Sequence, residues 1–221
     1  MSSFENIRSL SSFRKPKDEV IPRKKVGRIL EAGRNTPSPG NVQTLEFIAV
    51  EDDHSLENLG QILGDHRIGE APISVIVLAD EDRMKRKLGS NVREFCFSEG
   101  ATAVQNMRLT AEEEGISSIW KSGFDEHTVA ENFKVPDGKI PVSVVSFAFT
   151  DNPVRNEPRF GMNEVVYYDE YGHQISSFFN GVEWRGVGGE KKNFSKRGGG
   201  VFWRVESRGD KGFLIFEGYF F

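Results

Sequence analysis

Three short runs of hydrophobic residues along the chain are typical of β-strands. They cover residues 45–50 (LEFIAV), 73–79 (ISVIVLA) and 142–149 (VSVVSFAF). Each run is rich in β-branched and aromatic side chains and is bounded by Gly, Pro or Asp, which favours strands over helices. Because the runs are almost continuously apolar rather than alternating, we expect strands that are covered on both faces.

Between these runs, apolar residues spaced three and four apart predict helices. We expect helices at residues 23–33, 55–63 and 90–115. In the longest of them, Ser90 is the expected N-cap and Gly115 the expected stop signal. Its small and apolar side chains form one stripe, which consists of Val92, Cys96, Gly100, Ala103, Met107 and Ala111. A stripe on one helix face predicts that this face packs in the interior.

Helices that alternate with a few widely spaced strands indicate an α+β or α/β layer architecture, with a small sheet sandwiched by helices. The 221 residues suffice for one large domain, or for one domain with an appendage. Composition changes sharply near Gly172, because the last 50 residues hold 11 of the 23 glycines and 8 of the 18 phenylalanines. We therefore expect a domain at residues 1–171 and an extension at residues 172–221.

Net charge gives the chain no overall attraction for nucleic acid or for an anionic membrane, since it is −4. No apolar run approaches the 18 or so residues that span a bilayer, so we expect a soluble cytoplasmic protein without a membrane partner. The single cysteine, Cys96, cannot form an internal disulfide. Its place on the apolar stripe indicates a small core residue, and a reactive thiol is the alternative.

The common catalytic motifs are absent: there is no Walker lysine motif, no dinucleotide glycine fingerprint and no nucleophile elbow. The four histidines, His54, His66, His127 and His173, lack the spacing of metal ligands. We therefore expect neither a metal site nor a catalytic side chain of these kinds.

Four stretches, in a characteristic order, carry a family resemblance. Residues 7–14 (IRSLSSFR) are similar to an opening helix of pattern Ile-x-x-Arg-Arg-Ser-x-Arg, and residues 28–50 contain Pro-Ser-x-x-Asn-x-Gln before a strand. Residues 99–120 hold a Gln-Asn-x-x-Leu-x-Ala core, and residues 141–168 hold the last strand and an Arg-x-x-x-x-Glu-Val-Val stretch. Over about residues 4–170 the chain resembles the nitroreductase family of FMN-dependent oxidoreductases.

The resemblance implies an α+β fold with a mixed, mainly antiparallel sheet sandwiched by helices around a long central helix. It also implies a homodimer, because the Pro-Ser-x-x-Asn-x-Gln loop of this family reaches the flavin held by the partner subunit. Electrons would pass from NAD(P)H through FMN to a small acceptor, such as a nitro compound or a quinone, by a ping-pong mechanism. The implied FMN-binding residues are Ser12, Arg14, Pro37, Ser38, Asn41, Gln43, Gly115, Ile116, Ser117, Ser118 and Arg159.

The chemistry of these residues suits a flavin mononucleotide. Its phosphate needs cations and hydroxyl groups, which Arg14, Arg159 and Ser12 would supply. The side-chain amides of Asn41 and Gln43 both donate and accept hydrogen bonds, as the edge of the flavin ring requires. The redox chemistry belongs to the cofactor, so the resemblance needs no catalytic acid or base from the protein.

The chain also departs from the family pattern. Leu10 and Ser11 stand where two arginines are usual, and Thr44 stands where proline is usual. These departures suggest an alternative, a non-catalytic or degenerate flavin-binding dimer. A weaker alternative is a nucleic-acid-associated protein that acts through the basic stretch at residues 191–204.

Each group of candidate residues has a purely structural alternative as well. Ser12 and Arg14 would then lie on a solvated helix face, and Asn41 and Gln43 would cap the turn before a strand. Residues 115–118 would serve only as a helix stop.

Overall fold

The computed structural model describes residues 2–155 and 159–173. The described residues divide into two units, residues 2–155 and residues 159–173. The boundary that we predict at Gly172 stays a prediction, because residues 174–221 lie outside the described part of the chain. The basic stretch at residues 191–204 lies outside it too.

A four-stranded antiparallel sheet in the order β2-β3-β5-β4 forms the centre of the first unit. Its strands are β2 (Leu45–Val50), β3 (Ile73–Asp80), β5 (Lys139–Ala148) and β4 (Ser117–Lys121). A two-stranded antiparallel sheet pairs β1 (Ser11–Phe13) with β6 (Pro153–Arg155). The three predicted strands are present, and the expected mainly antiparallel sheet is confirmed.

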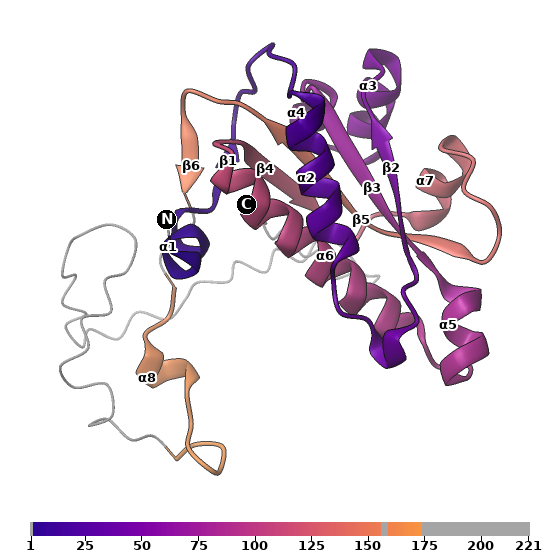
Figure 1. Cartoon of the computed structure of the whole chain (residues 1–221), viewed down its shortest axis with the longest axis vertical. Helices are drawn as coiled ribbons and strands as arrows, with labels where there is room; N and C mark the ends of the chain where they lie inside the picture. Colours follow the sequence, from indigo (N-terminus) through magenta and orange to yellow (C-terminus); the bar gives the residue numbers. More distant parts are fainter. Residues whose placement is uncertain (1, 156–158, 174–221) are drawn as a thin grey trace, which may run out of the picture. The chain divides into compact units, whose positions relative to one another are not determined.

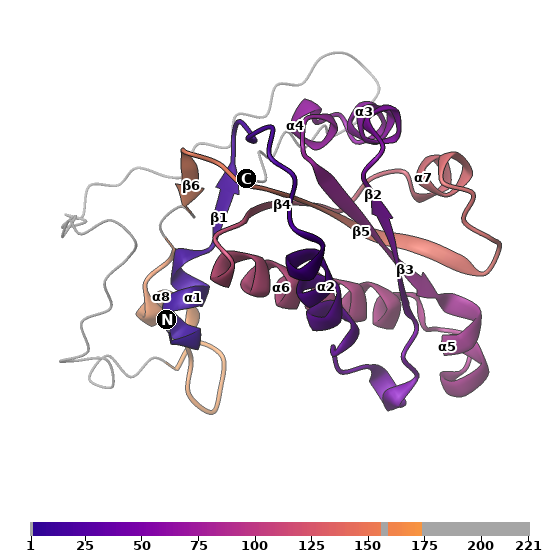
Figure 2. The same cartoon turned by 45° about the horizontal axis from the view of Figure 1, so that its top comes forward.

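Helices cover both faces of the four-stranded sheet, as Figures 1 and 2 show. One face carries α2 (Arg23–Arg34), α5 (Glu81–Leu88) and α6 (Arg93–Glu113). The other face carries α3 (Asp53–Ile62), α4 (His66–Gly69) and α7 (Glu126–Asn132). The predicted α+β sandwich with a long central helix is therefore confirmed.

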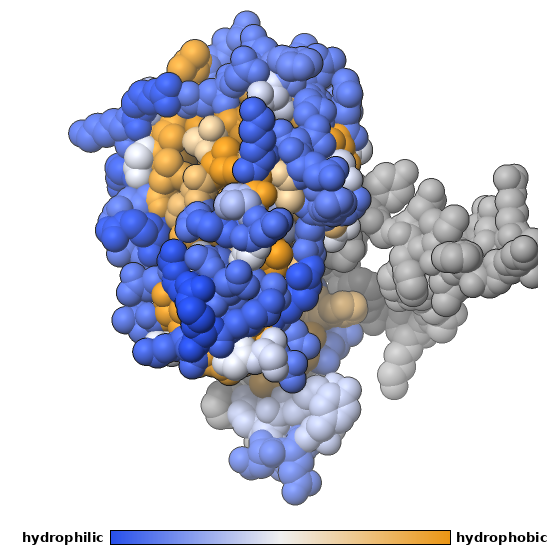
Figure 3. Space-filling view, turned by 90° about the vertical axis from the view of Figure 1, so that its right-hand side faces the viewer, coloured by the Kyte–Doolittle hydropathy of each residue, from blue (hydrophilic) through white to orange (hydrophobic). Residues whose placement is uncertain are grey.

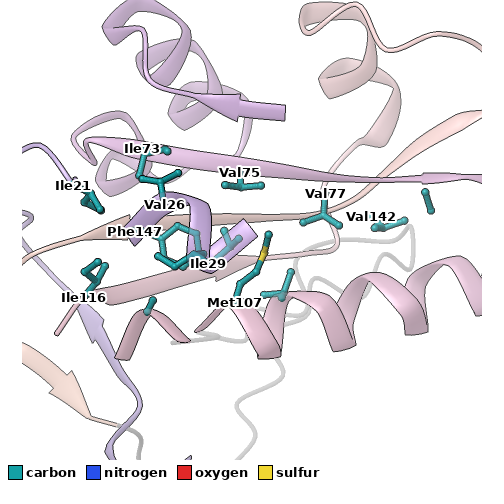
Figure 4. Packing of buried hydrophobic residues seen from close by; sticks show 14 of the residues in the cluster. Ile21, Val26, Ile29, Ile73, Val75, Val77, Met107, Ile116, Val142 and Phe147 are labelled. Atoms are coloured by element: carbon teal, nitrogen blue, oxygen red, sulfur yellow. The ribbon is translucent and has the colours of Figure 1, made fainter. Parts of the chain in front are cut away.

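The sequence of strand β3 is apolar almost without interruption because both faces of the strand are buried. Val75 and Val77 belong to the hydrophobic cluster that includes Met107 of α6, which Figure 4 shows beneath the strands. Ile76 and Leu78 belong to the cluster on the opposite face. Successive side chains of a strand point to opposite faces, so both sets need apolar residues.

Helix α6 is shorter at its start than we predict from the sequence. It begins at Arg93, and Val92 rather than Ser90 is the N-cap residue, without a side-chain cap. Val92 is fully buried, so packing rather than a hydroxyl cap sets this end. The predicted stop is confirmed: Gly115 has φ +74°. The amide of the next residue donates to the carbonyl oxygen of Ala111 at 2.9 Å, as in a Schellman cap.

Small residues let α6 approach its neighbours within the same chain. A Cβ atom at Gly100 would overlap Cγ2 of Val142 in β5. A Cβ at Gly33 of α2 would lie 2.8 Å from Cε of Met107. The α6 stripe is therefore covered by β5 and α2 of the same chain.

The opening helix implied for residues 7–14 is wrong in its position. Helix α1 (Ser3–Ser9) ends before Leu10, and β1 follows. Ser12 is the register partner of Val154 in β6, and the buried Leu10 and Phe13 fix this segment in the core. Ser12 and Arg14 thus lie in and after a strand rather than on a helix.

In the second unit, the structure describes residues 159–173. Helix α8 (Met162–Val165) begins where the Gly161 amide donates to Oε2 of Glu164 at 2.7 Å. The rings of Tyr167 and Tyr171 lie 4.5 Å apart between centroids. Within the described residues of the chain, no helix is long and apolar enough to cross a membrane.

Candidate functional site at the two ends of helix α6

The loop between α2 and β2 presents two neighbouring side-chain amides. Its backbone is closed by Ser38, whose Oγ accepts a hydrogen bond from the Gln43 amide at 2.9 Å. Nε2 of Gln43 donates to Oδ1 of Asn41 at 3.1 Å, and both side chains are exposed. This pairing leaves Nδ2 of Asn41 as a donor and Oε1 of Gln43 as an acceptor toward the outside.

The backbone of this loop is strained. Gly40, Asn41 and Gln43 have φ values of +58°, +55° and +56°. A left-handed conformation at a non-glycine residue costs on the order of 1–3 kcal/mol and persists where surrounding contacts enforce it. One such contact is the 2.7 Å hydrogen bond from Nη1 of Arg83 to the Gln43 carbonyl oxygen. Strain held in this way is typical of functional loops.

Both ends of the loop are tied to α6. The Thr44 amide and hydroxyl donate to the two carboxylate oxygens of Glu99, at 3.2 Å and 2.7 Å. Nδ2 of Asn106 donates to Oγ1 of Thr36 at 3.0 Å. Asn41 and Gln43, with Pro37 and Ser38, are therefore positioned by the long helix.

At the other end of α6, β1 packs beside β4. Oε2 of Glu112 accepts hydrogen bonds from the Ser11 amide at 3.1 Å and from its hydroxyl at 3.0 Å. The hydroxyl oxygens of Ser11 and Ser117 lie 2.8 Å apart. The segment that carries Ser12 and Arg14 is thus brought next to residues 115–118.

Polar groups at this end remain available for a ligand. Ser12 is half-buried and Arg14 is exposed, and neither side chain has a hydrogen-bond or ion-pair partner within residues 2–155 and 159–173. Arg108 of α6 adds a second cation: its Nε donates to Oγ of Ser118 at 3.1 Å, and burial lowers its pKa. Oδ1 of Asn6 is buried without a partner in the described structure.

Residues 115–118 point into the protein instead. Ile116, Ser117 and Ser118 are only 1%, 5% and 1% exposed, and the two hydroxyls are hydrogen-bonded to Ser11 and Arg108. Gly115 ends α6. Any contact of this segment with a ligand would have to come from its backbone, so a side-chain role in binding stays a prediction.

The two groups of candidate residues lie far apart within one chain. Glu99 anchors the loop and Glu112 anchors β1, and the helix rise separates these anchors by roughly 20 Å. Figure 1 shows β1 and the loop before β2 at opposite ends of α6. Arg159 belongs to the second unit and is exposed, and its expected part in the site stays a prediction.

The nitroreductase family model matches residues 7–66 and 63–149, which together are more than half of the chain. The chain belongs to the nitroreductase family. A relative from Methanothermobacter thermautotrophicus, provisionally named NADH dehydrogenase/NAD(P)H nitroreductase, is 26% identical over 162 residues, 69% of this chain and 80% of that protein.

Solved structures have the same fold. An FMN-dependent nitroreductase from Clostridium difficile superimposes with a TM-score of 0.66 at 23% identity, over 76% of this chain and 99% of that one. The NADPH:FMN oxidoreductase from Vibrio harveyi, solved with NAD+, gives a TM-score of 0.70 at 19% identity, over 78% and 79%. The family fold therefore extends across about three quarters of this chain.

This nitroreductase-family chain also has charged residues on α6 that the sequence patterns did not reveal. Glu99 is buried and Arg108 is half-buried, and each binds a residue of a candidate segment. A charged residue directly beside a stripe position, as Glu99 beside Gly100 and Arg108 beside Met107, was the available signal, because a charge that is taken out of water requires a specific partner. Among the residues that the structure describes, Cys96 has no such partner: burial raises the pKa of its thiol to about 11, which fits an inert core residue.

A further charged cluster joins α4 to β4. Oδ2 of Asp65 lies 2.7 Å from Nη2 of Arg67 and 3.1 Å from Nζ of Lys121. Burial alone would raise the pKa of Asp65, but the hydrogen bonds and charges of these two cations outweigh it and hold the pKa at about 2. The cluster ties the start of α4 to the edge strand β4.

Proposed function

We propose that the chain is an FMN-dependent NAD(P)H oxidoreductase that works as a homodimer and reduces a small acceptor. The observation that carries this proposal is the division of the candidate site between the two ends of α6. One end offers cations and a hydroxyl, and the other offers an amide donor and an amide acceptor.

The first end fits a phosphate group. Arg14 and Arg108 would supply positive charge, and Ser12 would supply a hydroxyl donor. Hydrogen bonds to a charged phosphate are shorter and about twice as strong as neutral ones. The carboxylate of Glu112 lies close by, but it is already engaged by Ser11.

The second end fits the edge of a flavin ring. Nδ2 of Asn41 can donate and Oε1 of Gln43 can accept, which matches a ring edge that carries both a carbonyl and an N–H group. When bound, FMN supplies the redox chemistry, which proteins commonly leave to the cofactor. The side chains would hold and orient it, and no protein acid or base is assigned.

A twofold dimer would unite the two ends. Since α6 holds them roughly 20 Å apart, a single chain does not present both to one ligand. In a symmetric dimer the loop of one subunit can face the β1 end of the other, and the symmetry creates two such sites. On the side of the first unit that carries α3, α5 and α7, Figure 3 shows a larger apolar area and several smaller ones among hydrophilic side chains. Such areas are typical of interaction surfaces.

Electron donor and acceptor would use the same place over the flavin in turn, which gives ping-pong kinetics. The test starts with the purified full chain. We expect a yellow protein whose released cofactor is FMN, whose absorbance bleaches with NADH or NADPH without oxygen, and whose mass by light scattering is that of a dimer. A colourless monomer that oxidises neither dinucleotide after incubation with FMN would refute the proposal.

The buried Leu10 and the internally bonded Ser11 favour a second candidate, a flavin-binding dimer without turnover. Leu10 is 4% exposed, and both the amide and the hydroxyl of Ser11 donate to Glu112. Neither residue therefore provides the phosphate contact that an arginine would make at its position. This candidate predicts a yellow dimer that dithionite bleaches but that neither NADH nor NADPH bleaches.

A further inference from the structure

A surface pocket of about 270 Å³ lies beside the loop that presents Asn41. Its lining consists of Asn41, Val42, Arg83, Arg86 and Lys87. The three cations belong to α5, where residues three and four apart share one helix face. Asn41 and Val42 form the opposite wall, so the pocket joins a basic helix face to the loop of the proposed flavin site.

The charge of this pocket is only partly neutralised. Arg83 donates to the Gln43 carbonyl oxygen at 2.7 Å and lies 3.3 Å from a carboxylate oxygen of Asp80. Arg86 and Lys87 are exposed and have no hydrogen-bond or ion-pair partner within residues 2–155 and 159–173. Two positive charges therefore face the pocket without a counter-charge.

Complementing the helix dipole would be a simpler role for these cations, because positive side chains stabilise the C-terminal turn of a helix. Lys85 lies in the same turn and serves that role while it pairs with Glu81 at 2.8 Å. The dipole does not account for the pocket itself. The pocket exists because the loop packs closely on the end of α5. A Cβ atom at Gly40 of the loop would lie 3.3 Å from Cδ2 of Leu88.

We propose that this pocket binds a phosphate group of the reduced dinucleotide that delivers electrons to the flavin. The inference rests on the proposed function. A nicotinamide ring must meet the flavin ring to react, and the loop with Asn41 and Gln43 would lie at that ring. The rest of the dinucleotide extends away from the loop, and the unneutralised cations of Arg86 and Lys87 lie directly beside it.

The pocket suits a part of the dinucleotide rather than all of it. Its volume is below the roughly 300–1,000 Å³ of pockets that enclose whole drug-sized ligands. A phosphate monoester carries about −1.5 to −2 charges at neutral pH, which two cations balance. The 2′-phosphate of NADPH is such a monoester. The pyrophosphate that NADH and NADPH share is a diester, but its two phosphates together carry about two negative charges, which two cations also balance.

The test compares the full-length double variant Arg86→Ala/Lys87→Ala with the matched control Lys85→Ala. Lys85 lies in the same helical turn, but it is paired and does not line the pocket. Two readouts are measured: the KM values for NADPH and NADH, and the Kd values of 2′,5′-ADP and 5′-ADP by calorimetry, which needs no turnover. Far-UV circular dichroism checks that all variants are folded.

We expect the double variant to weaken binding about tenfold or more, as the loss of charge-assisted hydrogen bonds predicts, while Lys85→Ala leaves it unchanged. A loss for NADPH and 2′,5′-ADP alone assigns the pocket to the 2′-phosphate. An equal loss for both dinucleotides and for 5′-ADP assigns it to the pyrophosphate. The charge-preserving variant Arg86→Lys/Lys87→Arg should retain most of the affinity.

Unchanged constants for all four ligands in the double variant would overturn the inference. That outcome differs from a failure of the proposed function, in which the wild-type chain itself would contain no flavin and oxidise neither dinucleotide.

Discussion

Thr44 donates two hydrogen bonds to one buried carboxylate, that of Glu99. The backbone amide lies 3.2 Å from Oε1 and the hydroxyl lies 2.7 Å from Oε2. Thr44 is fully buried and Glu99 is 3% exposed. Proline, which is usual in the family at this position, has neither an amide hydrogen nor a hydroxyl. Thr44 has both donors, and the Glu99 carboxylate on α6 accepts from both of them.

Replacing Thr44 by the proline usual in the family should therefore destabilise this chain. Thr44→Pro removes both donors and leaves the Glu99 carboxylate buried without them, so we expect the free energy of unfolding to fall by about 2 kcal/mol or more. Thr44→Ser retains both donors and is the control. Urea denaturation measures the effect, and equal midpoints for Thr44→Pro and wild type would show that the carboxylate finds other partners.

Gly100 should tolerate no side chain. Its Cβ would overlap Val142, so Gly100→Ala forces α6 away from β5, and we expect a loss of about 1–3 kcal/mol in unfolding free energy. Gly27 in α2 is the matched control, because a Cβ there meets nothing within 4 Å. Gly27→Ala should be neutral or stabilise by up to about 1 kcal/mol. Thermal unfolding should give a lower midpoint for Gly100→Ala and an unchanged or higher midpoint for Gly27→Ala, and a Gly100→Ala protein as stable as wild type would contradict this packing.

Asp65 should make stability depend on acid pH. Its folded pKa of about 2 is below the ordinary value of 3.8, so its contribution is present above about pH 4 and is lost as the pH falls toward 2. At 6% exposure the shift corresponds to about 2 kcal/mol. Asp65→Asn should lower stability at pH 7 by that order and flatten the decline between pH 4 and pH 2.

The exposed Asp53 serves as the comparison for this pH experiment. Asp53→Asn makes the same exchange at an exposed carboxyl, and its slope of unfolding free energy against pH is measured beside that of Asp65→Asn. An unchanged slope in Asp65→Asn would mean that Arg67 and Lys121 do not stabilise the charged form.

Arg14→Ala should lower the flavin content of the purified protein. The Arg14 guanidinium is exposed next to β1, and a lost charge-assisted hydrogen bond to phosphate corresponds to a loss of affinity of about tenfold or more. Lys24 is an exposed cation on α2 and provides the control variant Lys24→Ala. The ratio of flavin to protein absorbance measures occupancy, and wild-type occupancy in Arg14→Ala would place the phosphate elsewhere.

Sequence patterns predicted the core strands, in which most side chains are apolar and partly or fully buried. The core strands were visible because β3 is apolar on both faces. The strand β4 was missed because its sequence, SSIWK, begins with two serines, whose hydroxyls are satisfied by Ser11 and Arg108. Helix α5 was missed because it is largely charged and buries only Met84.

For the candidate site, residue spacing identified the segments but not the side chains that hold them. Asn41 and Gln43 were found through their motif, and the structure shows them exposed. Glu99 and Arg108 were missed, because the apolar stripe of α6 was considered without the charged residues directly beside it. Their partners are distant in sequence and close only in the fold, so a pattern of neighbouring residues cannot reveal them.

Helix α6 also acts as a spacer of fixed length and fixed angle. Glu99 and Glu112 hold the two halves of the candidate site on one continuous helix, so their separation depends on the number of residues between them rather than on any loop. One inserted residue would lengthen this spacer by only about 1.5 Å, but it would turn one anchor by about 100° relative to the other. A substitution in either half would therefore leave the spacing between the halves unchanged, whereas an insertion or deletion between Glu99 and Glu112 would alter the geometry of the whole candidate site.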